Sequence, residues 1–122
     1  NQKFICENTW LKPISKSAPI TKSLSNEKGY KIPIAHGEGR YFASEESMKK
    51  IIDNDQILFK YCDQKAEVNT GINPNGSLDN IAGICNKEKN VFGMMPHPER
   101  AASSSLDNVD GLELFHSLLS NC

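Results

Sequence analysis

The sequence of 122 residues has no long apolar run and no surplus of charge of either sign. A membrane-spanning helix needs about 20 consecutive apolar residues, and no stretch of this chain approaches that length. The 14 lysine and arginine residues nearly balance the 15 aspartate and glutamate residues, so no electrostatic footprint favours nucleic acid or a membrane surface as a partner. The sequence also opens without the basic segment and apolar run of a secretory leader. We therefore expect a cytoplasmic protein.

Close pairs of cysteines are absent as well. The four cysteines lie far apart, at Cys6, Cys62, Cys85 and Cys122, which fits neither a zinc ribbon nor a dense disulfide framework and favours reduced, mostly buried thiols. The surroundings of Cys85 superficially resemble the sharp strand-to-helix turn that carries some catalytic nucleophiles. Such a turn needs a small residue two positions further on and a helix behind it, whereas this sequence has Lys87 and a charged loop. We predict that Cys85 is a buried strand thiol.

The pattern of apolar residues predicts a single α/β domain over residues 1–122. The predicted strands cover residues 3–11, 30–35, 56–62, 81–85 and 91–95, and the predicted helices cover residues 44–54 and 109–119. Ser44 is a suitable N-cap for the first helix, because a serine side chain can accept a hydrogen bond from the first turn. Helices alternate with strands, but residues 86–90 join two strands as a hairpin loop, so we expect a mixed sheet with hairpins.

Two prolines flank a histidine after the last predicted strand, in the run Pro96-His97-Pro98-Glu99. Pro98 favours an extended backbone at His97, and in an extended chain side chains two residues apart project to the same side. A histidine oriented by a carboxylate is a competent general base for a cysteine or serine nucleophile, and catalytic residues of α/β sheets gather where strands end. We therefore name His97 and Glu99 as candidate catalytic residues. An incidental histidine in a surface loop is the alternative.

A second candidate is the run His36-Gly37-Glu38-Gly39, which follows another predicted strand. Glycines at alternate positions let a backbone approach a ligand closely, so exposed amide groups of this run could hold a small polar substrate. The run does not complete a dinucleotide-binding fingerprint, because Phe42 stands where the third glycine would fall. A tight turn at the end of a strand is the alternative.

The same histidines and carboxylates allow other functions. If His36 and Glu38 converged with His97 and Glu99 on one ion, the protein would be a metal-dependent hydrolase. The sequence lacks a third ligand of the cysteine type at the spacing of zinc deaminases, so we assign no metal ligand. A non-catalytic interaction domain is the third possibility.

Four longer runs carry a family resemblance. They are IPIAHGEGRY at residues 32–41, NPNGS at 73–77, IAGI at 81–84 and NVFGMMPHPERA at 90–101. Together they resemble the glutaminase subunits of phosphoribosylformylglycinamidine synthases, which are class I glutamine amidotransferases of purine biosynthesis. The resemblance spans nearly the whole chain, and it implies the C-terminal half of a flavodoxin-like class I glutamine amidotransferase fold.

In that family, a cysteine attacks the side-chain amide of glutamine, ammonia leaves, and water hydrolyses the thioester to glutamate. The ammonia passes to a synthetase subunit, which uses ATP and magnesium to amidinate formylglycinamide ribonucleotide, and a small accessory subunit completes the complex. The resemblance implies that His97 is the general base and acid of a Cys-His-Glu triad and that Glu99 orients it. It also implies that backbone groups of His36, Gly37 and Glu38 hold glutamine, and that this chain itself needs no cofactor.

The sequence departs from the family in one respect. The nucleophile of the family stands in a Gly-x-Cys-Asn-Gly turn, which belongs upstream of the position where this chain begins. We therefore expect residues 1–122 to be the C-terminal part of one amidotransferase domain, with the N-terminal part as a further partner. The chain alone is expected to be inactive.

Overall fold

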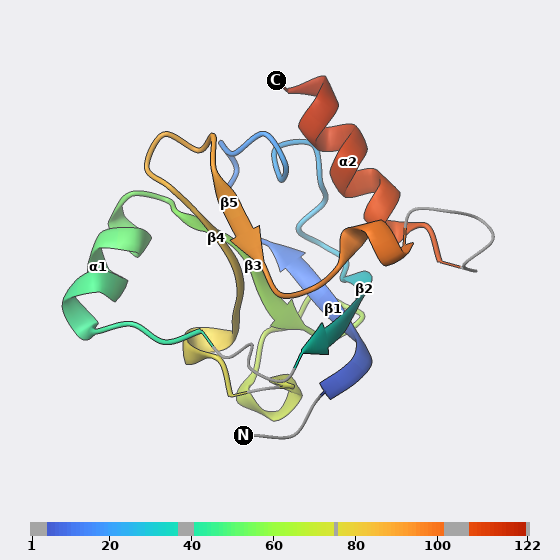
Figure 1. Cartoon of the computed structure of the whole chain (residues 1–122), viewed down its shortest axis with the longest axis horizontal. Helices are drawn as coiled ribbons and strands as arrows, with labels where there is room; N and C mark the ends of the chain where they lie inside the picture. The colour runs from blue at the N-terminus through green and yellow to red at the C-terminus, as the bar shows by residue number, and fades with distance from the viewer. Residues whose placement is uncertain (1–4, 37–40, 75, 102–107, 122) are drawn as a thin grey trace.

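The computed structural model describes residues 5–36, 41–74, 76–101 and 108–121 (Figure 1). Two of the predicted substrate-binding residues, Gly37 and Glu38, lie outside the described residues. The strands and α-helices are β1 (Ile5–Pro13), β2 (Tyr30–His36), α1 (Glu45–Asp53), β3 (Ile57–Cys62), β4 (Ile81–Cys85), β5 (Phe92–Met94) and α2 (Asp110–Ser120). Short 3-10 helices are η1 (Thr70–Ile72), η2 (Leu78–Asn80) and η3 (Pro98–Ala101). Neither α-helix of the described residues has the length and apolarity of a membrane span.

The five strands form one sheet in the order β2-β1-β3-β4-β5, and every adjacent pair is antiparallel. The predicted α/β class and the hairpin of β4 and β5 are confirmed. The sheet differs from the expected mixed sheet in having no directly bonded parallel pair among the described strands. The reason is that β1 lies between β2 and β3, so the two strands that α1 connects run in the same direction without being neighbours.

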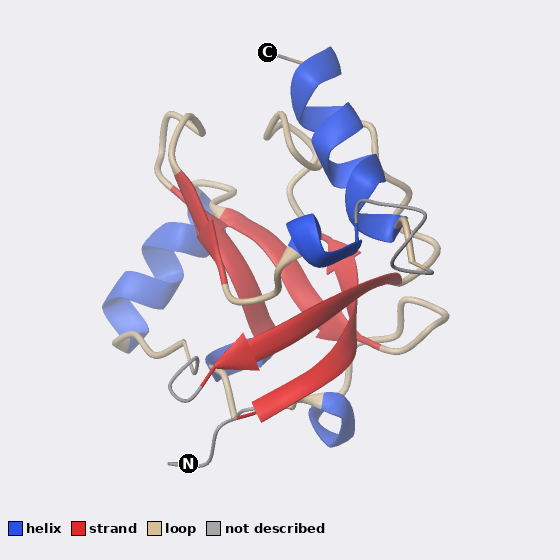
Figure 2. Ribbon diagram, turned by 45° about the vertical axis from the view of Figure 1, so that its right-hand side comes forward, coloured by secondary structure: helices blue, strands red, loops and turns tan. Residues whose placement is uncertain are grey.

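The sheet is strongly twisted, and the two α-helices lie on opposite sides of its strands (Figure 2). Tyr30, Ile32 and Ile34 share one face of β2, as the alternating pattern predicts, and all three are buried. They belong to one core cluster with Leu11 of β1 and Leu114 of α2. This packing fixes α2 beside β2, at the end of the molecule where the candidate catalytic residues lie.

Helix α1 begins where its sequence predicts. The side chain of Ser44 accepts a hydrogen bond from the backbone N–H of Ser47 at 3.2 Å, and Glu45 and Glu46 occupy the first turn, where carboxylates are favourable. No described residue of α1 is buried, and Ile52 on its apolar stripe is 54 % exposed. The first predicted helix is therefore confirmed, but its apolar stripe is not part of the core.

Candidate active site

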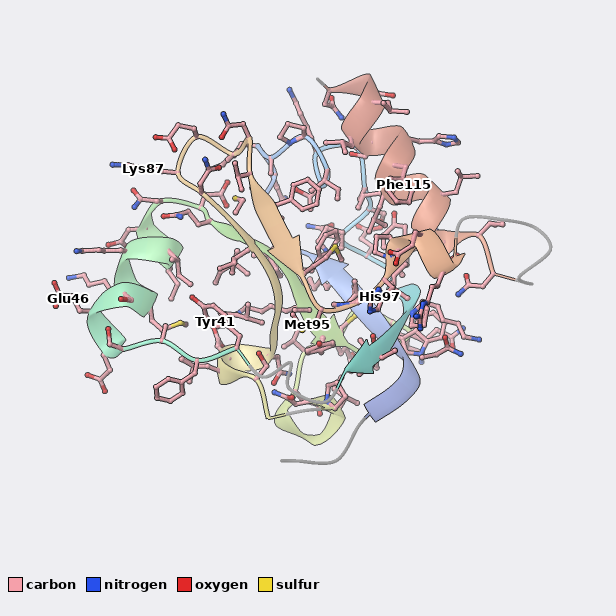
Figure 3. The ribbon with its side chains drawn as sticks, viewed as in Figure 1. Tyr41, Glu46, Lys87, Met95, His97 and Phe115 are labelled. Atoms are coloured by element: carbon pink, nitrogen blue, oxygen red, sulfur yellow. The ribbon has the colours of Figure 1, made fainter. Side chains whose placement is uncertain are left out.

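The two candidate catalytic side chains meet. Nδ1 of His97 lies 2.9 Å from Oε2 of Glu99, on the segment that joins β5 to α2 (Figure 3). The contact does not arise from the extended chain that the sequence predicts, because Glu99 lies in the first turn of η3. Pro98 is the first residue of that turn, where its fixed φ angle suits a helix and its missing N–H costs no hydrogen bond. The turn folds the carboxylate back toward the imidazole.

The backbone around His97 is anchored on the outer edge of β2. The N–H of His97 donates to the carbonyl oxygen of Pro33 at 2.8 Å, and the N–H of Arg100 donates to the carbonyl oxygen of His97 at 3.0 Å. Pro96 is fully buried on one side of the histidine, and Ala101 is fully buried on the other. The imidazole therefore projects from a fixed stretch of backbone.

This anchoring also relates the two predicted site segments. Pro33 lies three residues before His36, the last residue of β2. The backbone that leads into the glycine-rich run therefore lies beside the backbone of His97. The side chain of His36 is outside the described part of the molecule, as are Gly37 and Glu38, so their role in binding substrate stays a prediction.

Glu99 is an ionised carboxylate at neutral pH. Its partial desolvation acts to raise the pKa, but a hydrogen bond from its own backbone N–H, the hydrogen bond from His97 and the charge of Arg100 together hold the pKa below the ordinary value. An ionised carboxylate can only accept hydrogen bonds, so Nδ1 of His97 carries the shared proton. The other ring nitrogen, Nε2, is then unprotonated in the neutral imidazole and can accept a proton. The His97 side chain is 33 % exposed, so part of it is accessible to a reacting group.

The described thiols do not supply a nucleophile. Cys62 and Cys85 are free and buried. Burial raises the pKa of Cys62 to about 12, with a further contribution from Asp63. Burial also raises the pKa of Cys85, and its Sγ lies 3.6 Å from the carbonyl oxygen of Gln56. The interpretation of Cys85 as a buried strand thiol is confirmed.

A metal centre has little support in the described part of the chain. No group of three or more histidine, cysteine, aspartate or glutamate side chains is assembled there. His97 and Glu99 are occupied with each other at 2.9 Å. The other two residues that could bind a metal ion, His36 and Glu38, lie outside the described side chains. The absence of a metal-binding group is therefore established for His97 and Glu99 and not for His36 and Glu38.

The loop that contains the NPNGS run has a structural role that the sequence did not reveal. Oδ1 of Asn73 accepts from the N–H of Gly76 at 2.8 Å and from the N–H of Ser77 at 3.2 Å. Oγ of Ser77 accepts from the N–H of Tyr41 at 3.1 Å, and the N–H of Leu78 donates to the carbonyl oxygen of Tyr41 at 2.8 Å. The loop thus fastens the first described residue after the glycine-rich run.

The fold is that of a glutamine amidotransferase. A family model described as a CobB/CobQ-like glutamine amidotransferase domain matches residues 1–113, and the chain belongs to this family. The resemblance recognised in the sequence is therefore confirmed at the level of the family.

Curated relatives carry a more particular name. The chain is 50% identical over 121 residues to the phosphoribosylformylglycinamidine synthase subunit PurQ of Aquifex aeolicus, with 99% of this chain and 53% of that protein covered. It is 44% identical over 119 residues to the subunit of the same name from Methanocaldococcus jannaschii, with 98% and 52% covered. A solved structure of PurLQS from Thermotoga maritima superposes with a TM-score of 0.75 at 34% identity, covering 98% of this chain and 48% of the matched chain.

The chain therefore spans about half the length of the curated relatives it matches. The fold of the matched PurLQS chain is also the fold of this one over nearly all of its residues. The percentages of coverage give the length of each relative that is matched and not its position. The predicted correspondence to a C-terminal half therefore stays a prediction.

Proposed function

We propose that this chain is part of the glutaminase component of a phosphoribosylformylglycinamidine synthase, with His97 as the general base and acid and Glu99 as its orienting partner. The observation that carries the proposal is the 2.9 Å contact between Nδ1 of His97 and Oε2 of Glu99. It is supported by the lowered pKa of Glu99 and by relatives that are named PurQ.

The chemistry follows from the free ring nitrogen. Nε2 of His97 takes the proton of a cysteine thiol, and the thiolate attacks the side-chain carbonyl carbon of glutamine. The tetrahedral intermediate collapses as the protonated imidazole gives its proton to the departing nitrogen, which leaves as ammonia. Water then attacks the thioester, with His97 again as base, and the products are glutamate and the restored thiol. Glu99 holds the Nδ1–H tautomer and stabilises the imidazolium in each step.

Glutamine binding is assigned to the end of β2. We assign recognition of the substrate to backbone groups of His36, Gly37 and Glu38, which follow the strand that holds the backbone of His97. The fixed contact between Pro33 and His97 supports this assignment, because it places the start of the glycine-rich run and the base on neighbouring segments.

The nucleophile comes from a segment outside these 122 residues. Cys62 and Cys85 are buried, and their thiols have raised pKa values, which is the opposite of what nucleophilic catalysis needs. We propose that the chain alone is inactive and that it acts with the cysteine-bearing part of the same amidotransferase domain.

Further partners follow from the assembly named for the solved relative. A PurLQS structure supports a complex in which this component passes ammonia to a synthetase subunit beside a small third subunit. In that complex ATP and magnesium serve the synthetase reaction on formylglycinamide ribonucleotide, whereas glutamine hydrolysis uses only side chains and backbone groups. We assign the complex to the cytoplasm as part of this proposal.

The test is reconstitution of glutaminase activity. This chain is co-expressed with the part of the Aquifex aeolicus PurQ subunit that its match leaves uncovered, and glutamate release from glutamine is measured. His97→Ala is expected to abolish the release, and His116→Ala, a change at an exposed position of α2, is expected to leave it unchanged. Release that survives His97→Ala would refute the proposal.

A further inference from the structure

Helix α2 lies so close to the backbone of Pro98 that no side chain would fit at Gly111. Its inner face carries Gly111, Leu114 and Ser117, all buried. A Cβ atom at Gly111 would overlap the carbonyl oxygen of Pro98 and would lie 2.8 Å from its carbonyl carbon and 3.0 Å from its Cα. These atoms are backbone, so they cannot rotate aside as the end of a side chain would. Glycine at this position lets α2 touch the residue that separates His97 from Glu99.

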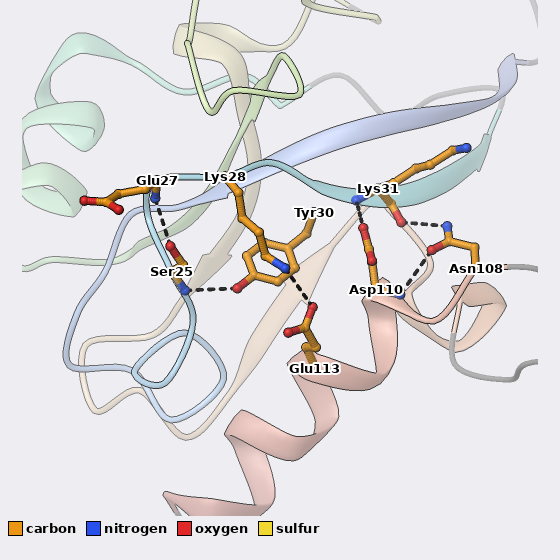
Figure 4. Close-up of polar contacts among 8 residues, drawn as sticks. All are labelled: Ser25, Glu27, Lys28, Tyr30, Lys31, Asn108, Asp110 and Glu113. Carbon is orange, nitrogen blue, oxygen red and sulfur yellow. Dashed lines mark hydrogen bonds and ion pairs between the residues drawn. The ribbon is translucent and has the colours of Figure 1, made fainter.

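The N-terminal end of α2 is fastened to the edge strand. Oδ2 of Asp110 accepts from the backbone N–H of Lys31 at 2.8 Å, and Nδ2 of Asn108 donates to the carbonyl oxygen of the same lysine at 2.8 Å. Oδ1 of Asn108 also accepts from the N–H of Asp110 at 3.1 Å. Figure 4 shows the two side chains next to each other along the outer edge of β2, at the Lys31 backbone. Their hydrogen bonds satisfy the backbone N–H and the carbonyl oxygen of Lys31 at the outer edge of β2, as a neighbouring strand would.

The rest of α2 is fastened along its length. Lys28 pairs with Glu113 at 3.3 Å. Oγ of Ser117 donates to the carbonyl oxygen of Pro19 at 2.9 Å, and Nδ2 of Asn121 donates to Oγ of Ser23 at 2.8 Å. With Leu114 fully buried in the core, the helix cannot retreat from η3 without breaking several contacts. A collision at Gly111 would therefore displace the shorter and more exposed segment around Pro98.

One edge strand thus holds both partners of this contact. Lys31 binds α2, and Pro33, two residues further along the same edge of β2, binds the backbone of His97. Between the contacts of Lys31 and Pro33, the carbonyl oxygen of Pro98 packs against α2 at Gly111. The position of η3 is therefore set by β2 on one side and by α2 on the other.

We propose that Gly111 is a positioning residue that keeps Glu99 within hydrogen-bonding distance of His97. Asn108 and Asp110 assist it by binding the start of α2 to the backbone of β2. Gly111 touches no reacting atom and acts through Pro98. The catalytic consequence rests on the proposed function, whereas the structural consequence does not. A displaced η3 would release the Nδ1–H tautomer, and the free nitrogen would no longer be fixed at Nε2.

The test compares two glycine-to-alanine variants. Gly111→Ala is the probe, and Gly93→Ala in β5 is the matched control, because nothing lies within 4 Å of a Cβ at Gly93. The ¹⁵N chemical shifts of the His97 imidazole report which ring nitrogen carries the proton, and they are measured on the chain alone. Gly111→Ala is expected to lose the Nδ1–H signature, and Gly93→Ala is expected to keep it.

Activity gives the second readout. In the reconstituted enzyme, Gly111→Ala is expected to lower kcat by up to about 10²-fold, since a displacement of about 1 Å can have that effect, while KM for glutamine changes less than about twofold because the substrate-binding run is untouched. A folded Gly111→Ala variant that keeps both the Nδ1–H signature and the rate would overturn the proposal.

A second pair of variants guards against misfolding of Gly111→Ala. Asp110→Ala removes the acceptor for the Lys31 N–H and is expected to weaken the Nδ1–H signature. Asp110→Asn keeps an acceptor oxygen and is expected to restore it. Equal signatures in these two variants would also overturn the proposal. If the signature responds as expected but the unsubstituted enzyme releases no glutamate, the positioning role stands and the proposed glutaminase function fails.

Discussion

The ring of His97 and the carboxylate of Glu99 face each other across Pro98, and the main chain of the histidine is bound to the carbonyl oxygen of Pro33 at 2.8 Å. A histidine and carboxylate two residues apart in a mobile loop would meet only part of the time. Here the buried Pro96 and the edge of β2 fix the backbone before any substrate arrives. The orientation of the imidazole is therefore built into the fold, which is the kind of preorganisation that the proposed catalysis requires.

The first prediction concerns the carboxylate. Glu99→Gln keeps the size of the side chain but removes its charge, and the amide can donate to Nδ1 and so favour the wrong tautomer. We expect kcat for glutamate release to fall about 10²-fold, the lower end of the ~10²–10⁴-fold range for acid–base catalysis, because Glu99 is 61 % exposed and water partly replaces it. Steady-state kinetics of the reconstituted enzyme measure this.

The control for that experiment is Glu88→Gln in the loop between β4 and β5. Glu88 is exposed, and the change removes the same charge away from His97. The rate should stay within a factor of about two, because an exposed charge that does not contact His97 is largely screened by water and salt. An equal fall in both variants would show that net charge, and not the contact with His97, is responsible.

The second prediction concerns pH. The folded state holds the pKa of Glu99 below its ordinary value of 4.5, so the ionised carboxylate stabilises the fold above that pH, and the stabilisation is lost as the pH falls through the lowered pKa. The difference in unfolding free energy between the unsubstituted chain and Glu99→Gln should therefore be larger at pH 6 than at pH 3. Urea unfolding at a series of pH values measures it, and a difference that grows toward pH 3 would contradict the assignment.

The sequence predicts much of the local structure because local causes dominate it. Ser44 caps α1 through a contact within one turn, and the alternation of Tyr30, Ile32 and Ile34 places one face of β2 in the core. The pairing of His97 with Glu99 is also local. Even there, the sequence predicts an extended chain, whereas Pro98 begins a 3-10 turn.

The remaining features depend on contacts between distant residues. The hydrogen bonds from Asn108 and Asp110 to the Lys31 backbone join residues more than seventy positions apart in the sequence. No periodicity or spacing predicts them. In the sequence, Gly111 is a glycine within a predicted helix, and its close contact with Pro98 becomes apparent only in the folded structure. The arrangement of a sheet in which β1 separates β2 from β3 likewise follows from the whole fold.

The third prediction concerns the packing of α2. Leu114 is fully buried in the core, so Leu114→Ala should lower the free energy of unfolding by about 2–5 kcal/mol. Leu119 on the same helix is 75 % exposed, and Leu119→Ala should change it by no more than about 0.5 kcal/mol. Urea denaturation followed by circular dichroism separates the two. Similar losses in both variants would mean that α2 does not pack on the sheet as described.

The last prediction concerns the buried thiols. The pKa of Cys62 is raised to about 12, and that of Cys85 is raised above its ordinary value by burial, which outweighs the nearby charge of Lys89. Because only the thiolate reacts with iodoacetamide, both cysteines should be alkylated at pH 8 more slowly in the native chain than in urea. Mass spectrometry of peptides assigns the label to each cysteine. Rapid native labelling of Cys85 would reopen its candidacy as a nucleophile, and Cys85→Ala would then have to abolish glutamate release. Its position in β4, with Sγ beside the carbonyl oxygen of Gln56, leads us to expect full activity in Cys85→Ala.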